Sequence, residues 1–124
     1  MKFPADRRYS KQHHWVRMED GLATISISEF AQFEVGEVHS VSVASTGKRL
    51  LRNEVYGTIE AFNTDLPLNM PVAGTVVEFN PLLATTPSLV NKDPYGSGWI
   101  IKVKVSDEDE LKELMQAWEY MGGW

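Results

Sequence analysis

The sequence predicts a mainly β fold in a single domain, with a short internal helix and a C-terminal helix. Five runs of residues have strand-like patterns, turn residues separate them, and an apolar stripe at helical spacing lies near the end of the chain. At 124 residues, the chain has an ordinary length for one domain. Because 43% of its residues are hydrophobic and 23% are charged, we expect a globular domain over 1–124. Only residues 1–8, half of which are charged and which include Pro4, are expected to be ragged.

The five strand-like runs are read from alternation of apolar and polar residues. Residues 22–28 place Ala23 and Ile25 on one face and Thr24 on the other, which predicts a half-buried strand. The two prolines and two asparagines of residues 63–71 predict a connection rather than an interior strand, because proline cannot donate to a ladder. The other predicted strands are 38–43, 55–62, 72–79 and 99–105.

Two segments are predicted to be helical. Ser28 can cap a helix of about two turns that Gly36 closes. Phe30 and Phe33 fall on one side of this helix and are expected to face the core. The second helix is predicted over 106–121, where acidic residues at the start suit the helix dipole. We expect it to pack on the strands through its apolar stripe, which consists of Leu111, Leu114, Met115, Trp118 and Met121.

Charge and composition exclude several classes of protein. A net charge of −5 repels phosphate backbones, so we expect no nucleic-acid partner. Without cysteine, the chain has no disulfide, thiolate metal site or cysteine nucleophile. No apolar run reaches the roughly 20 residues of a membrane span, and no secretory signal is present. We therefore expect a cytoplasmic protein with no membrane partner. The N-terminal basic residues could form a small docking patch, although a solvated face is the favoured interpretation; they are Arg7, Arg8, Lys11 and Arg17.

The chain lacks the motifs of an enzyme or a metal protein. His13 and His14 are adjacent, so on a strand they point to opposite faces and cannot chelate one metal together. Ser97 lies in Gly-Ser-Gly, which is not the spacing of a nucleophile elbow. No glycine-rich phosphate-binding motif is present. We expect no catalytic residue and no metal site. Trp124 either packs on the domain or is exposed for a partner.

Several segments together resemble the H protein of the glycine cleavage system. They are YSKQHHW (9–15), ATISISEFAQFEVGEV (23–38), PVAG (71–74) and LVNKDPYGSGWIIKVK (89–104). This resemblance implies a flattened barrel-sandwich hybrid of the lipoyl/biotinyl-carrier type. It also implies a lipoate arm, joined by an amide to a lysine at the tip of a β-hairpin.

The sequence departs from this family pattern at the lysine itself. Counting back from Pro71 places Glu60 at the family's glutamate and Asn63 at the lipoyl-lysine position. A carboxamide is not nucleophilic, because its nitrogen lone pair is delocalised into the carbonyl. A change of register does not help, since no lysine lies between Lys48 and Lys92. We therefore expect no cofactor, and in particular no lipoate.

A second departure concerns the residue that meets the loaded arm. The family usually has His-Glu-Trp where this chain has His13-His14-Trp15, so His14 replaces the family carboxylate. The predicted function is a non-catalytic protein-binding or regulatory module. Its candidate partners are glycine cleavage enzymes or lipoate-attaching enzymes. Two alternatives remain open: a working carrier that shuttles the aminomethyl group, and a small-ligand binder that uses the arm-docking cleft.

Overall fold

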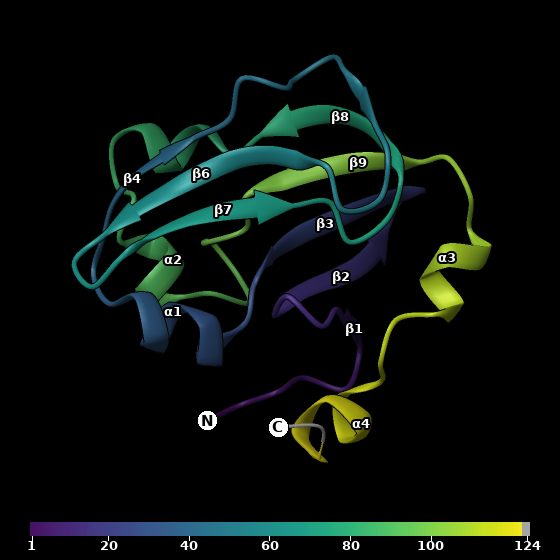
Figure 1. Ribbon diagram of the computed structural model, residues 1–124, viewed down its shortest axis with the longest axis horizontal. Helices are drawn as coiled ribbons and strands as arrows, with labels where there is room; N and C mark the ends of the chain where they lie inside the picture. Colours follow the sequence, from purple (N-terminus) through teal and green to yellow (C-terminus); the bar gives the residue numbers. More distant parts are fainter. Residues whose placement is uncertain (123–124) are drawn as a thin grey trace.

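The computed structural model, which describes residues 1–122, consists of two antiparallel sheets with short helices around them (Figure 1). The first sheet has six strands in the order β1-β2-β3-β9-β8-β5, and the second has three in the order β4-β6-β7. The six strands are β1 (Arg8–Tyr9), β2 (His14–Glu19), β3 (Leu22–Ile27), β9 (Ile101–Val105), β8 (Gly74–Phe79) and β5 (Arg49–Leu50). The three strands are β4 (Val38–Ser42), β6 (Val55–Ala61) and β7 (Asp65–Asn69). The helices are α1 (Glu29–Val35), the 3-10 helix η1 (Pro81–Ala84), α2 (Leu89–Lys92), α3 (Asp109–Lys112) and α4 (Ala117–Gly122).

The hydrophobic core lies between the two sheets. Ile25 and Val103 from the six-stranded sheet join Ile59 and Leu68 from the three-stranded sheet, and all four are fully buried. Each such side chain contributes about 1.5–3 kcal/mol by leaving water. The mainly β class and the flattened barrel-sandwich are thus confirmed. None of the helices within residues 1–122 is long and apolar enough to cross a membrane.

A smaller aromatic cluster joins the N-terminal segment to α4. The rings of Tyr9 and Tyr120 stack with centroids 4.7 Å apart, and Trp15 and Ala117 belong to the same buried group. The guanidinium of Arg7 lies 4.5 Å from the centre of the Trp15 ring. Residues 1–8, which were expected to be ragged, make contacts with the rest of the domain. The backbone N–H of Lys2 donates to Glu29 at 2.7 Å, and the carbonyl of Pro4 accepts a hydrogen bond of 2.7 Å from the Tyr9 hydroxyl.

The half-buried strand predicted over 22–28 is buried on both faces. Thr24 and Ser26 are 3% and 0% exposed, although they lie opposite the apolar face. β3 is paired on both sides, by β2 and β9, and the loop before β9 covers its second face. The hydroxyl of Ser26 donates to the carbonyl oxygen of Gly98 at 2.9 Å, so the buried polar side chain is satisfied.

The connection predicted over 63–71 contains a strand. Residues 65–69 form β7, in which Pro67 pairs with Thr58 of β6. β7 is the last strand of its sheet, so its outer side lacks a neighbouring strand in that sheet. A proline is tolerated on such an edge strand because its missing N–H breaks no ladder bond.

The single helix predicted over 106–121 is two short helices with a break between them. Within the break, Met115 exchanges two backbone hydrogen bonds of 2.8 Å with Tyr9. A continuous helix could not make this extended pairing, because its backbone groups would be bonded internally. Leu114 is buried, whereas Trp118 is 71% exposed and does not pack as predicted. The predicted alternatives for Trp124 lie outside the described residues.

Candidate functional site

The tip of the β6–β7 hairpin carries Asn63, and it lies against the C-terminal end of α1 (Figure 1). Two backbone hydrogen bonds join the tip to the helix end. The N–H of Phe62 donates to the carbonyl of Glu37 at 2.9 Å, and the N–H of Asn63 donates to the carbonyl of Val35 at 2.8 Å. The hairpin tip is therefore attached to the body of the domain.

The side chain of Asn63 also bonds to α1. Its Nδ2 donates to the carbonyl oxygen of Glu34 at 3.0 Å. The last carbonyls of a helix lack partners within the helix, so this amide caps one of them. Gly36, the C-cap residue, has φ 81° and ψ −162° and leaves room for the amide. A Cβ at Gly36 would lie 3.0 Å from Asn63 Nδ2.

Glu60 lies on β6, close to the tip, and is exposed. It stands directly opposite Asp65 in the hairpin register. Two carboxylates thus flank Asn63 in sequence and give this end of the hairpin a negative charge. Such a pair is mildly destabilising to a hairpin, because like charges face each other.

His14, the second predicted site residue, lies in the interior and not on the surface of the hairpin tip. It is 1% exposed, and its Nε2 lies 2.8 Å from the hydroxyl of the buried Tyr56. Burial lowers the pKa of His14 to about 4, so the imidazole is neutral at pH 7. The structure therefore does not bring His14 and Asn63 together at one surface. A neutral imidazole also offers no negative charge to an amine, whereas a carboxylate does.

His13 has a structural role in the aromatic cluster. Its backbone has φ 64°, and its Nδ1 lies 2.6 Å from the hydroxyl of Tyr120. Burial lowers the pKa of His13. Within residues 1–122, no three histidine or acidic side chains are grouped so that they could hold a metal ion.

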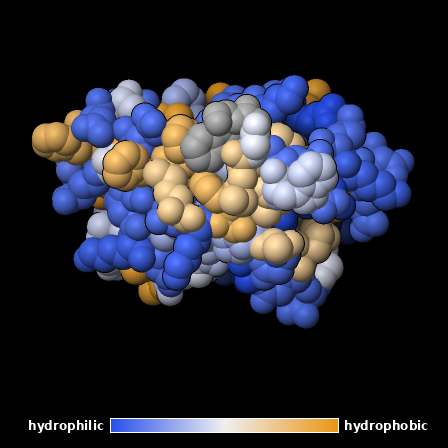
Figure 2. Space-filling model, turned by 90° about the horizontal axis from the view of Figure 1, so that it is seen from below, coloured by the Kyte–Doolittle hydropathy of each residue, from blue (hydrophilic) through white to orange (hydrophobic). Residues whose placement is uncertain are grey.

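An apolar surface that was not predicted from the sequence lies beside Asn63. Phe33 was predicted to face the core, but it is 67% exposed, because α1 buries Ala31 and Val35 instead. Phe62, next to Asn63, is 78% exposed. The sequence contained one signal for this surface, because Phe62 is a large apolar residue next to Asn63, where the resemblance places the lipoyl attachment. Figure 2 shows the molecule from below, where hydrophobic residues lie across the middle of the face and hydrophilic residues surround them.

The residues at the tip do not fit a lipoyl group. Attachment needs an amine, and Asn63 offers an amide whose nitrogen already donates to Glu34. The lysines nearest in sequence lie elsewhere: Lys48 precedes β5, and Lys92 is the last residue of α2. Neither lies on the β6–β7 hairpin.

Comparison with known proteins gives one consistent result. The family model for the glycine cleavage H-protein matches residues 7–122. The chain is 43% identical to the glycine cleavage system H protein of Bacteroides fragilis, over 97% of this chain and 95% of that protein. It is 42% identical to the protein of the same name from Salinibacter ruber, over 97% of each. It also resembles the crystal structure of a glycine cleavage system H protein from Mycobacterium marinum, with a TM-score of 0.89, 29% identity and 98% of each chain covered. The chain therefore belongs to the glycine cleavage H-protein family.

Proposed function

We propose that this family member works without lipoate, as a non-catalytic protein-binding module. The observation that carries the proposal is Asn63, which stands at the tip of the hairpin and bonds through its amide to Glu34. An amide cannot be acylated as a lysine can. The tip is also fixed to α1 by two backbone hydrogen bonds, which suits a rigid docking surface better than a mobile arm.

The proposed docking surface consists of Phe33 and Phe62, on either side of Gly36. Both rings are more than two-thirds exposed, and large exposed aromatic side chains are typical anchors of protein interfaces. The surrounding carboxylates, Glu34 and Glu37, are exposed and would favour a partner with a basic rim. Candidate partners are the enzymes of glycine cleavage or of lipoate attachment. The cytoplasm is the proposed compartment.

A second candidate function is that of a working carrier in glycine cleavage. The comparisons favour it, because the relatives named above are all called glycine cleavage system H proteins. A carrier would need the arm on another lysine, of which Lys48 and Lys92 are the nearest to the hairpin in sequence. The two candidates therefore differ in one measurable property, the mass of the purified protein.

Intact mass after co-expression with a lipoate ligase separates the two candidates. We expect the unmodified mass, while a lysine-bearing member of the family in the same cells gains a lipoyl group and shows that the ligase is active. A lipoyl group mapped to any lysine of this chain would establish the carrier and overturn the proposal.

Binding to purified enzymes tests the docking surface. Glycine decarboxylase and lipoate ligase from the source organism are titrated with the wild-type protein and with Phe62→Ser. We expect one of them to bind, and we expect Phe62→Ser to weaken binding by about tenfold or more, as for a buried aromatic anchor. Leu51→Ser is the matched control, because Leu51 is 65% exposed but lies before β6, at the other end of the hairpin. Equal losses in both variants would contradict the assignment of the surface, and no binding at all would contradict the proposed partners.

A further inference from the structure

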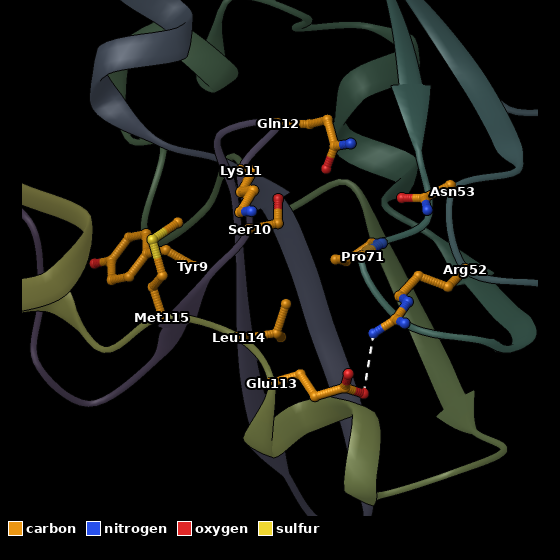
Figure 3. Close-up of a pocket in the computed structure, with 10 residues that line it drawn as sticks. All are labelled: Tyr9, Ser10, Lys11, Gln12, Arg52, Asn53, Pro71, Glu113, Leu114 and Met115. Atoms are coloured by element: carbon orange, nitrogen blue, oxygen red, sulfur yellow. Dashed lines mark hydrogen bonds and ion pairs between the residues drawn. The ribbon is translucent and has the colours of Figure 1, made fainter. Parts of the chain in front are cut away.

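A second site is suggested by a hollow at the end of the β6–β7 hairpin that lies away from Asn63 (Figure 3). The hollow has a volume of about 340 Å³. Four parts of the chain that are distant in sequence surround it: residues 9–12, residues 52–53, Pro71 and residues 113–115. We call it the Lys11 hollow. The proposed docking surface does not use it.

The walls of the Lys11 hollow are held by hydrogen bonds and ion pairs. Tyr9 and Met115 bond to each other through both backbone groups at 2.8 Å. The backbone N–H of Asn53 donates to the carbonyl of Met70, also at 2.8 Å. Arg52 reaches across to Glu113, with Nη1 3.1 Å from Oε2. The hollow is therefore formed before any ligand arrives, which lowers the ordering cost of binding.

The lining combines an apolar floor with a polar rim. Leu114, Met115 and Pro71 supply the apolar surface. Leu114 and Pro71 are buried. In Figure 3 the amide groups of Gln12 and Asn53 lie above the hollow, with Leu114 below them. A ligand with one polar end and one apolar end fits this arrangement.

The polar rim offers hydrogen-bond donors that lack acceptors. The side chains of Lys11, Gln12 and Asn53 make no hydrogen bond or ion pair with any residue of 1–122. Ser10 is 5% exposed, and its Oγ accepts a hydrogen bond from the N–H of His14 at 3.1 Å. Within the described chain, the Ser10 hydroxyl hydrogen has no acceptor, although the residue is buried beside the hollow. A ligand oxygen could accept this hydrogen.

The charge of the hollow favours an anion. Arg52 pairs with Glu113 at 3.1 Å and with Glu110 at 3.8 Å, so Lys11 is the lining cation whose charge has no carboxylate partner within residues 1–122. Lys11 also differs from the nearby basic residues, which have partners of their own. Arg8 donates to the carbonyl of Leu114, and Arg17 pairs with Glu19 at 2.7 Å.

We propose that the Lys11 hollow binds a small organic carboxylate with a short aliphatic chain. The carboxylate accepts hydrogen bonds from Lys11 and from the Ser10 hydroxyl, while the chain covers Leu114 and Met115. This site is independent of the proposed docking surface, since it lies at the other end of the hairpin.

Titration followed by ¹H–¹⁵N NMR tests the proposal, with acetate, hexanoate and inorganic phosphate as the probes. We expect hexanoate to shift the amide signals of residues 10–12, 53 and 113–115. We also expect it to bind at least about tenfold more tightly than acetate, because its extra CH₂ groups leave water. Phosphate has no apolar chain and should bind more weakly than hexanoate. Phosphate binding as tight as hexanoate, or shifts confined to other residues, would overturn the assignment.

Two lysine variants complete the test. Lys11→Met keeps a long side chain without the charge, and we expect it to weaken hexanoate binding by about tenfold, as for a lost charged hydrogen bond. Lys92→Met is the control, because Lys92 is exposed on α2 and does not line the hollow. Lys11 is exposed, so its replacement leaves the core unchanged. Equal affinities of Lys11→Met and wild type would contradict the site.

Discussion

The amide of Asn63 donates a hydrogen bond of 3.0 Å to the carbonyl of Glu34, the last residue but one of α1. A hairpin tip thereby caps the end of a helix that lies 29 residues earlier in the chain. The resemblance to the family implies that a lysine at this place would carry the arm. In this chain the same position has a structural bond, and that bond and the missing amine can be tested separately.

Asn63→Lys introduces the amine but removes the bond to Glu34. We expect this variant to be lipoylated weakly or not at all, because Phe62 and Pro67 still differ from the small and polar residues of the family tip. We also expect a loss of about 0.5 kcal/mol in the free energy of unfolding, since the lost bond is exposed. Intact mass and urea unfolding measure the two effects. Asn63→Ala is the control for stability, and full lipoylation of Asn63→Lys would show that the tip is unchanged except for one residue.

Gly36→Ala tests how closely the tip approaches the helix end. At φ 81° and ψ −162° only glycine is unstrained, and the new Cβ would lie 3.0 Å from Asn63 Nδ2. We expect a loss of about 1–3 kcal/mol in the free energy of unfolding. Gly21→Ala is the matched comparison, because Gly21 has φ 80° but no atom within 4 Å of the new Cβ. If Gly36→Ala costs no more than Gly21→Ala, the contact with Asn63 adds nothing to the strain.

Local signals in the sequence were sufficient to predict where α1 begins and ends. Ser28 accepts a hydrogen bond from the N–H of Ala31, and Gly36 ends the helix, as the capping residues predicted. The signals for Phe33 were insufficient, because which side of a two-turn helix is buried depends on what packs against it. The family resemblance predicted that Asn63 lies at the hairpin tip, but it did not predict the hydrogen bond from Asn63 to Glu34.

Long-range contacts explain the errors elsewhere in the fold. Ser26 is buried by Gly98, which is 72 residues away in sequence, so alternation in β3 suggested an open face that does not exist. The C-terminal stripe was read as one helix, but pairing of Met115 with Tyr9 interrupts it. Both errors have the same cause. Periodicity describes a single segment, whereas the residues that pack against that segment come from distant parts of the chain.

Tyr120→Phe tests the attachment of α4. The Tyr120 hydroxyl lies 2.6 Å from His13 Nδ1 and 2.7 Å from Ser28 Oγ, and its ring stacks on Tyr9. The variant keeps the ring but removes both polar contacts, so we expect a loss of about 1–3 kcal/mol in the free energy of unfolding. Trp118→Ala, a larger truncation on the same helix, should change it by no more than about 0.5 kcal/mol, because Trp118 is 71% exposed. A reversed order of the two effects would contradict the described packing of α4.

The buried pair of His14 and Tyr56 predicts how stability changes with pH. Burial lowers the folded-state pKa of His14 to about 4, whereas an unfolded histidine titrates near 6.5. Between these values the unfolded chain binds a proton that the folded chain does not, so stability rises with pH across this window. The stabilisation is complete above about pH 6.5 and is lost as the pH falls towards 4 and below. The contribution of His14 approaches roughly 1.4 kcal/mol for each pH unit inside the window.

His14→Gln is the variant that isolates this contribution. Glutamine does not titrate and is long enough to keep a hydrogen bond to the Tyr56 hydroxyl, so its stability should depend less on pH than that of the wild type. The measurement is the free energy of unfolding in urea between pH 4 and pH 7.5, compared pairwise between the two proteins. The burial of His13 also lowers its pKa and acts in the same direction, but it is present in both proteins and cancels in the comparison. Carboxylates that titrate near pH 4 are also present in both proteins, so their effect on the free energy of unfolding cancels as well. Parallel pH profiles would mean that His14 binds its proton equally well in the folded and unfolded chains, which is incompatible with an imidazole enclosed between the sheets beside Tyr56.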